Sequence, residues 1–135
     1  MSNTDPLTIF RTLTTIPRDS GDEKKVAEYL ISFAEKRGLE AVKDDADNVI
    51  IRKPAAAGYE KVPVLVLQSH SDMVYVKGED SPHDYNSPLE LIEEDGFLRA
   101  EGTSLGADNG IGMAFALAIL DSGDLPHPPL EVLFT

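Results

Sequence analysis

The sequence has 135 residues, enough for one domain of ordinary size. Hydrophobic residues make up 41%, so a core can be buried, and 24 acidic against 12 basic residues give a net charge of −12. This negative charge disfavours binding to nucleic-acid phosphates and to an anionic membrane surface. It suits a protein that concentrates divalent cations, although solubility is the commoner reason for an acidic composition.

The sequence contains no cysteine, so a disulfide framework is excluded and any metal site must use His, Asp and Glu. No basic residue precedes an apolar stretch within residues 1–10, so we expect no secretory signal peptide. The longest apolar run, 113–120, is far shorter than the roughly 18 residues that a membrane span needs. The expected location is therefore the cytoplasm.

A first helix is predicted from Asp5 and Pro6, which are typical of an N-cap and of the first helical position. Leu7, Phe10 and Leu13 then recur on one face of this helix. The segment ends before residue 17, a proline.

A second helix is predicted after Ser20 and Glu23, which match a capping box. Gly38 fits a left-handed cap at its C-terminal end. Spacings of three and four define its expected buried stripe: Val26, Ala27, Leu30, Ile31 and Ala34.

Strands and a hairpin are predicted next. Residues 48–52 form a short β-branched run, and 62–68 are so apolar that we expect both faces of this strand to be covered. Residues 74–88 are a polar surface loop. Two short strands then flank a turn at Asp95 and Gly96, the pattern of a β-hairpin.

The last predicted elements are a buried helix over 110–120 and a strand over 130–135. The order of elements predicts an α/β fold, a mixed sheet with helices on both faces. The final strand has the apolar pattern of an interior strand, which normally leads into a further covering element. We therefore expect the natural chain to continue past Thr135.

A His-x-Asp pair follows the most apolar strand, where His70 and Asp72 would share a face because strand side chains alternate. The carboxyl end of a strand is where ligands bind in open α/β sheets. A carboxylate beside an imidazole can fix its tautomer. Taken alone the pair is a weak signal, and a polar strand terminus explains it better.

A glycine-rich string occupies residues 102–112, with four glycines around Asp108 at a predicted strand-to-helix junction. It matches neither the phosphate-binding loop, which needs a Lys, nor the spacing of the dinucleotide fingerprint. Read locally, Asp108 is a simple N-cap and the glycines allow close packing or close approach of a ligand.

Three strings together resemble the aminoacyl-histidine dipeptidase family of two-metal exopeptidases. They are VLVLQSHSDMV (64–74), GTSLGADNGIGMA (102–114) and HPPLEVLFT (127–135), and the resemblance extends over essentially the whole sequence. Ser69 and Ser71 depart from the Gly and Leu expected around His70. The chain would then be the N-terminal part of a metallopeptidase catalytic domain, with the remainder of that domain and a dimerisation domain lying outside residues 1–135.

The resemblance implies a role for each candidate residue. His70 would bind one metal ion, Asp108 would bridge two, and Asp72 would be a catalytic residue that orients His70 or the general base. Two divalent ions, most often zinc with manganese or cobalt as alternatives, would activate a water for peptide hydrolysis. The family's general-base Glu and its remaining ligands would follow Thr135. It also implies a cis peptide bond between Asp108 and Asn109.

The expected function is hydrolysis of dipeptides, with Xaa-His as the expected substrate class, in a parent protein that forms a homodimer. We expect the 135-residue chain to be inactive alone. The alternatives are a related tripeptidase, an N-acyl amino acid deacylase, or a non-catalytic module that keeps the fold. His83 and His127 are expected to be solvated loop histidines, and Glu131 has no assigned role.

Overall fold

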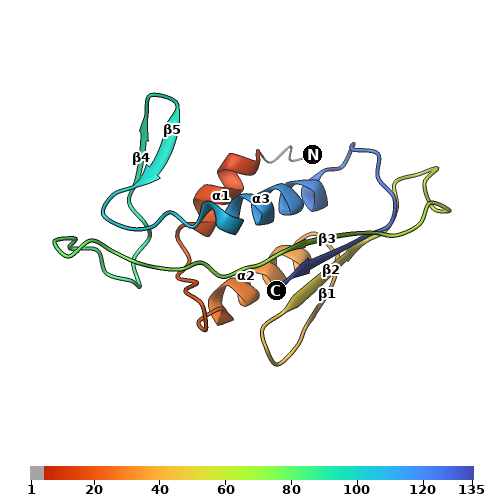
Figure 1. Cartoon of the computed structure of the whole chain (residues 1–135). Coiled ribbons are helices and arrows are strands. Elements are labelled where there is room, and N and C mark those ends of the chain that lie inside the picture. Colours follow the sequence, from red (N-terminus) through yellow and green to blue (C-terminus); the bar gives the residue numbers. More distant parts are fainter. Residues whose placement is uncertain (1–4) are drawn as a thin grey trace.

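The structure, a computed structural model, describes residues 5–135. Residues 1–4, which belong to the segment expected to carry no signal peptide, lie outside this range. No helix within 5–135 has the length and apolar character to cross a membrane. The elements in chain order are α1 (Pro6–Leu13), α2 (Lys24–Glu35), β1 (Glu40–Lys43), β2 (Val49–Lys53), β3 (Leu65–Ser69), β4 (Leu91–Glu94), β5 (Phe97–Ala100), α3 (Ala107–Asp121) and β6 (Leu130–Phe134), as shown in Figure 1.

Four strands form one mixed sheet in the order β1-β2-β6-β3. β6 lies between β2, to which it is antiparallel, and β3, to which it is parallel. The prediction of an interior strand at the end of the sequence is therefore confirmed. β1 was not predicted, because its sequence EAVK contains one β-branched residue and no alternation of apolar side chains.

β4 and β5 pair as a separate two-stranded hairpin that projects away from the sheet (Figure 1). Asp95 and Gly96 connect the strands with positive φ angles of 53° and 80°. Two consecutive left-handed residues are what a tight hairpin turn requires, and Asp-Gly supplies them at low cost. The predicted hairpin is confirmed.

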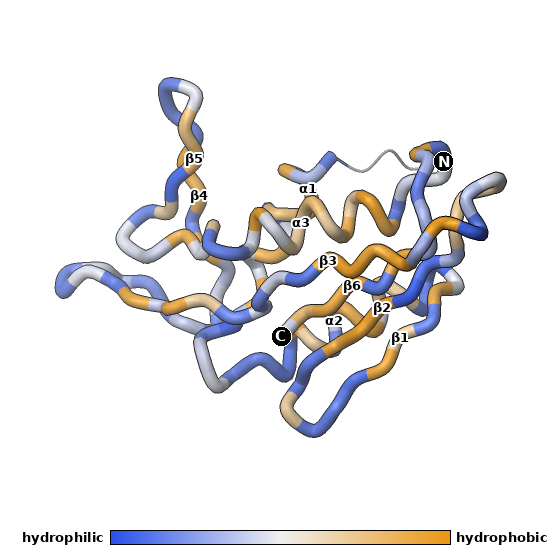
Figure 2. The backbone as a smooth tube through the Cα atoms, turned by 45° about the vertical axis from the view of Figure 1, so that its right-hand side comes forward, coloured by the Kyte–Doolittle hydropathy of each residue, from blue (hydrophilic) through white to orange (hydrophobic). Residues whose placement is uncertain are grey.

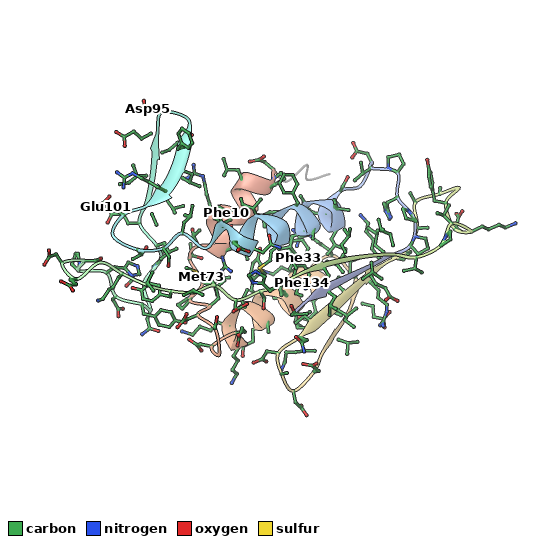
Figure 3. The ribbon with its side chains drawn as sticks, viewed as in Figure 1. Phe10, Phe33, Met73, Asp95, Glu101 and Phe134 are labelled. Atoms are coloured by element: carbon green, nitrogen blue, oxygen red, sulfur yellow. The ribbon has the colours of Figure 1, made fainter. Side chains whose placement is uncertain are left out.

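The core lies on one face of the sheet. Its central strands bury four fully covered side chains, Val49, Ile51, Val132 and Phe134. The strand register places all four on the same face, where they join one cluster with buried residues of α1, α2 and α3. Phe10 of α1 and Phe33 of α2 belong to this cluster together with Phe134 (Figure 3).

The predicted fold class, a mixed α/β sheet with helices, is confirmed, but one detail differs. We expected helices on both faces, whereas α1, α2 and α3 all pack against the single face that carries this cluster. On the other face, Ile50 and Leu133 stay partly exposed. The hydrophobic stretches of β2, β3 and β6 are visible side by side in Figure 2.

The expectation that both faces of 62–68 are covered is wrong for the described residues. Val64, Leu65 and Val66 are 52%, 46% and 55% exposed. β3 is an edge strand of the four-stranded sheet, and one of its faces has no helix above it. An apolar run shows what a strand would bury, but not which neighbours are present to cover it.

The first helix follows its sequence signals closely. Asp5 accepts a hydrogen bond from Thr8 N at 3.2 Å, so it is the N-cap that the sequence predicts. Ile9 is buried with Phe10 and Leu13, whereas Leu7 is 40% exposed. The amphipathic stripe therefore lies slightly to one side of the predicted one.

The second helix departs from prediction at its start. It begins at Lys24, with Glu23 as an N-cap whose side chain makes no capping bond to the helix. The capping box is therefore wrong, and the Ser20 hydroxyl bonds elsewhere. Phe33 replaces Ile31 in the buried stripe. Gly38 has φ of 65°, the left-handed conformation predicted after the helix.

Candidate functional site

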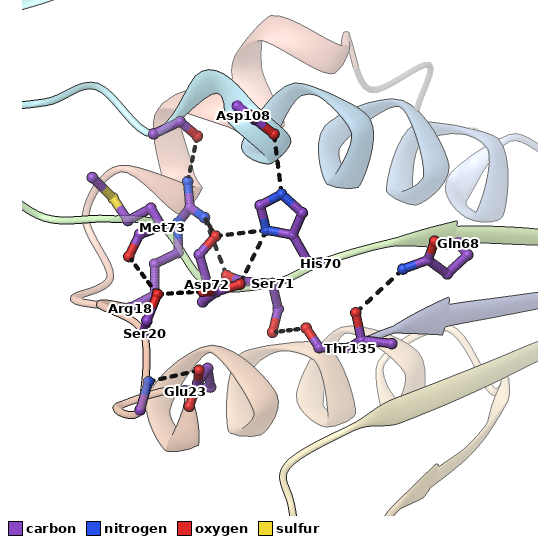
Figure 4. A network of polar contacts seen from close by, with 12 residues as sticks. Arg18, Ser20, Glu23, Gln68, His70, Ser71, Asp72, Met73, Asp108 and Thr135 are labelled. Carbon is purple, nitrogen blue, oxygen red and sulfur yellow. Dashed lines mark hydrogen bonds and ion pairs between the residues drawn. The ribbon is translucent and has the colours of Figure 1, made fainter.

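His70 and Asp108 come together from two different parts of the fold. His70 follows directly after β3, and Asp108 lies in the first turn of α3, as drawn in Figure 4. Their side chains meet with Nε2 of His70 3.0 Å from Oδ1 of Asp108. The close approach of these two side chains, which the resemblance implies, is therefore confirmed.

Asp72 holds the other side of the same imidazole ring. Nδ1 of His70 lies 3.0 Å from Oδ1 of Asp72 and 3.1 Å from its main-chain oxygen. A carbonyl oxygen only accepts hydrogen bonds, so Nδ1 donates and Nε2 is the nitrogen that faces Asp108. This arrangement leaves Nε2 as the atom through which His70 can act on a ligand.

The electrostatics of the cluster follow from these contacts. Burial lowers the pKa of His70, but the hydrogen bonds to Asp108 and Asp72 outweigh it and raise the pKa above the ordinary 6.5. The hydrogen bond from the Ser20 hydroxyl, followed by that from His70, lowers the pKa of Asp72 despite some desolvation. The cluster therefore favours an ionised Asp72 beside a basic imidazole.

Asn109, and not Asp108, caps the regular part of α3. Asp108 and Asn109 have non-helical backbone angles, and Gly112 N donates to Asn109 Oδ1 at 3.0 Å. The interpretation of Asp108 as a simple N-cap is therefore wrong. Its side chain is 97% exposed and free to face His70. The peptide bond between Asp108 and Asn109 is cis, as the resemblance implies.

Two further residues at this site escaped sequence reasoning. The Ser20 hydroxyl donates to Oδ2 of Asp72, on the opposite carboxylate oxygen from His70. Arg18 reaches the main chain around both motifs from the segment between α1 and α2. The spacing of Ser20 and Glu23 predicted helix capping, which is a different role, and no local sequence pattern distinguished Arg18.

The other candidate residues lie away from this site. His83 contacts the Tyr75 hydroxyl through Nδ1 at 2.7 Å and Pro88 O through Nε2 at 3.0 Å. His127 is only 8% exposed, so its prediction as a solvated histidine is wrong. Glu131 pairs with Arg52 on the sheet at 3.4 Å.

A cleft of about 760 Å³ runs beside residues 78–84 and includes neither His70 nor Asp108. Within 5–135 no three His, Cys, Asp or Glu side chains are grouped closely enough to hold a metal ion. The described residues therefore offer a pair of candidate ligands with a supporting carboxylate, and not a complete metal site.

Comparison with known proteins relates the sequence and the fold of the chain to dipeptidases. No family model matches the chain. The chain is 44% identical over 128 residues to the cytosol non-specific dipeptidase of Escherichia coli K12, an alignment that covers 94% of the chain and 26% of that protein. It is 42% identical to the aminoacylhistidine dipeptidase of Vibrio alginolyticus, whose crystal structure matches 96% of the chain with a TM-score of 0.91.

A tripeptidase structure from Staphylococcus aureus matches the whole chain with a TM-score of 0.76 at 24% identity, a likeness of fold alone. The chain spans about a quarter of the length of these dipeptidases, 26% of one and 27% of the other. The fold is therefore that of a peptidase-type α/β domain. Over the segment that these matches cover, the chain is similar in sequence and in fold to a fragment of the aminoacyl-histidine dipeptidases.

Proposed function

We propose that the chain supplies His70 and Asp108 to a two-metal centre that hydrolyses dipeptides in the protein that its relatives represent. The observation that carries the proposal is the 3.0 Å contact between His70 Nε2 and Asp108 Oδ1, made by the two motifs of the resemblance. The proposed substrates are Xaa-His dipeptides. In this proposal residues 1–135 are the N-terminal part of the catalytic domain.

The residues present fit part of such a centre. His70 directs one ring nitrogen outward while Asp72 holds the other, the usual arrangement around a metal-binding histidine. Asp108 has a carboxylate that is 97% exposed, with Oδ1 in contact with His70, so it is accessible to a ligand from outside. His with Asp suits zinc, with manganese or cobalt as alternatives. Such ions, when bound, would supply polarisation of a substrate carbonyl and a lowered pKa for a bound water.

Asp72 has a positioning role in this proposal, with two separate partners for its two carboxylate oxygens. His70 occupies Oδ1 and the Ser20 hydroxyl occupies Oδ2. A carboxylate fixed at both oxygens holds the imidazole plane in one orientation, so Nε2 keeps its direction toward Asp108. Asp72 also favours the tautomer that leaves Nε2 available as a ligand.

The chain alone is proposed to be inactive. Within 5–135 the pair has no third ligand group, and the general-base Glu that the resemblance implies is not among these residues. Two ligands bind a single divalent ion weakly, because water fills the other positions. Purified chain with Co²⁺ and a Xaa-His dipeptide should show no turnover, with the Escherichia coli relative as positive control. Turnover comparable to that control would refute the site assignment.

The function itself is tested in a chimera in which this chain replaces the matching segment of the Escherichia coli relative. The chimera should hydrolyse Xaa-His dipeptides, and His70→Ala or Asp108→Ala should abolish the activity. Asp95→Asn is the matched control, because Asp95 lies at the turn of the β4–β5 hairpin, which projects away from the four-stranded sheet (Figure 3). An active, folded His70→Ala chimera would contradict the proposal.

Substrate choice separates the alternatives in the same chimera. A preference for tripeptides would favour the tripeptidase, whose fold the chain shares. A preference for N-acyl amino acids would favour a deacylase, and a folded but inactive chimera would favour a non-catalytic module. A cytoplasmic location and a homodimeric parent remain part of the proposal, as does the absence of nucleic-acid and membrane partners.

A further inference from the structure

Arg18 is a buried arginine whose contacts lie outside the element that carries it. The residue is 1% exposed and belongs to the segment between α1 and α2. Its guanidinium donates to three main-chain carbonyl oxygens: Ser71 at 3.1 Å, Asp72 at 3.2 Å and Gly106 at 2.7 Å. Burying a charged group costs free energy, and these hydrogen bonds offset that cost for Arg18.

The three acceptors belong to the two segments that carry the candidate ligands. Ser71 and Asp72 follow His70 directly, and Gly106 lies two residues before Asp108. One planar guanidinium therefore connects the segment after β3 to the segment before α3, as Figure 4 shows. The His70–Asp108 contact joins the same two segments.

The main chain of Arg18 reinforces one side of this connection. Met73 N donates to Arg18 O at 2.9 Å, and Ser20 N donates to Met73 O at 3.0 Å. Residues 18–20 thus run beside residues 71–73 and are hydrogen-bonded to them. The guanidinium then reaches past this pair of segments to Gly106.

The glycine-rich string is shaped around the same guanidinium. A Cβ atom at Gly106 would lie 2.8 Å from Nη2 of Arg18 and 2.6 Å from Sδ of Met73. A Cβ atom at Gly110 would lie 2.7 Å from the same Nη2 and 2.8 Å from Cε2 of Phe10. Two of the four glycines therefore make room for Arg18, in addition to any ligand that approaches from outside.

We propose that Arg18 is a positioning residue that locks the segments bearing His70 and Asp108 into register. Its planar fork meets two carbonyls with one nitrogen and a third carbonyl with the other, a geometry that a lysine ammonium cannot reproduce from one rotamer. The consequence of this role for catalysis rests on the proposed function. The fixed register of the two segments does not, because Arg18 holds it in the metal-free chain.

The test compares Arg18→Met and Arg18→Lys with Arg37→Met in the same chain. Arg37 is the control, because its side chain is 29% exposed, bonds Asp121 at 2.6 Å and lies over the Phe33 ring, away from the site. The readout is the ¹H–¹⁵N spectrum of the imidazole rings at one fixed pH. Circular dichroism and urea unfolding establish that each variant is folded.

Both Arg18 variants should shift or broaden the His70 resonances and leave those of His83 and His127 in place. Arg37→Met should lower the urea midpoint without moving His70. In Arg18→Ala, millimolar guanidinium chloride, far below denaturing concentration, should restore the His70 resonances by filling the vacated space, and equal NaCl should not. A folded Arg18→Met with wild-type His70 resonances would overturn the proposal, and so would an equal change in Arg37→Met.

Loss of folding in every Arg18 variant, without recovery in guanidinium, would also overturn it in favour of a general folding role. Co²⁺ titration gives the link to the proposed function. Arg18→Met should weaken Co²⁺ binding by about 10–100-fold, the usual effect of losing support behind a metal ligand. If the chimera carrying the wild-type chain folded but hydrolysed no dipeptide, the proposed function would fail while the imidazole spectra still decided the role of Arg18.

Discussion

Gly110→Ala should destabilise the chain even though alanine is the better helix former. Gly110 is the first regular residue of α3 and its φ is not in the left-handed region, so alanine suits its backbone. The change gains about 0.5–1 kcal/mol of helix propensity. Against this, the new Cβ atom would lie 2.7 Å from Arg18 Nη2 and 2.8 Å from Phe10 Cε2.

Neither neighbour can retreat into solvent. Phe10 is 0% exposed and Arg18 is 1% exposed, so relief requires a movement of α1 or loss of the Arg18 bond to Gly106. Overpacking of this kind costs about 1–3 kcal/mol. A lost hydrogen bond from a charged donor adds about 1.5–3 kcal/mol. After the helix gain is subtracted, the expected net loss is about 1.5–5.5 kcal/mol.

Urea unfolding followed by circular dichroism measures this loss, with Gly78→Ala as the matched control. A Cβ atom at Gly78 meets nothing within 4 Å and its φ is also outside the left-handed region. Gly78→Ala should therefore change the free energy of unfolding by less than about 0.5 kcal/mol. Gly110→Ala should also be non-additive with Arg18→Met, since the second change removes part of the clash. Equal effects of the two glycine variants, or strict additivity, would refute the reasoning.

Three further changes test other contacts. Asn109→Ala should cost about 1 kcal/mol by removing the α3 cap while Asn109→Asp keeps most of it, and urea midpoints that do not distinguish them would show that the cap is not used. Ser20→Ala should destabilise the chain at neutral pH by about 1 kcal/mol through loss of its bond to Asp72, and Ser87→Ala, at another exposed serine that bonds Asp84, is the control. The pKa of Asp72 is lower in the folded chain, so its ionised form stabilises the fold fully above about pH 3.8, and this stabilisation is lost as pH falls through the folded pKa. The loss of stability in Ser20→Ala should therefore shrink in acid. A loss that does not depend on pH would exclude the link to Asp72. Lys53→Met should cost about 1–2 kcal/mol, because Nζ donates to three carbonyl oxygens at the C-terminal end of α3, and an unchanged thermal midpoint would contradict this.

Local chemistry accounts for the elements that the sequence predicted well. Asp5 and Pro6 at a helix start, and Asp95 with Gly96 in a tight turn, act through their own backbone preferences and nearest neighbours. β6 was recognisable because its sequence LEVLF is almost entirely apolar, and the structure buries alternate residues from Leu130 to Phe134. Each of these signals is complete within a few residues, so no knowledge of the remaining fold is needed.

Elements that depend on distant partners were less predictable. The apolar run around β3 indicates burial, but the exposure of Val66 depends on what lies beside an edge strand. Ser20 has the right spacing to Glu23 for a capping box, yet its hydroxyl bonds a carboxylate 52 positions later. Arg18 bonds carbonyls up to 88 positions away. No local pattern carries such information.

The site residues show the same division between motif and tertiary contact. His70 and Asp108 were identified from the strings around them, and the fold brings them to 3.0 Å. Their support was predicted only in part, because Asp72 is adjacent in sequence while its second partner, Ser20, comes from another segment. The pairing of His70 with Asp108 therefore follows from the resemblance, whereas the contacts that hold His70 in place are seen only in the structure.

The neighbouring residues Asp108 and Asn109 explain why one ambiguity could not be resolved from sequence. Asp and Asn are almost equally good N-caps, so either could start the helix over 110–120. The structure gives the cap to Asn109, whose Oδ1 accepts from Gly112 N. Because Asn109 fills the capping position, the Asp108 carboxylate makes no capping bond; it is 97% exposed and contacts His70. Of these two adjacent residues of similar shape, Asn109 caps the helix and Asp108 contacts His70. The difference is set by which of them lies within reach of the helix amides.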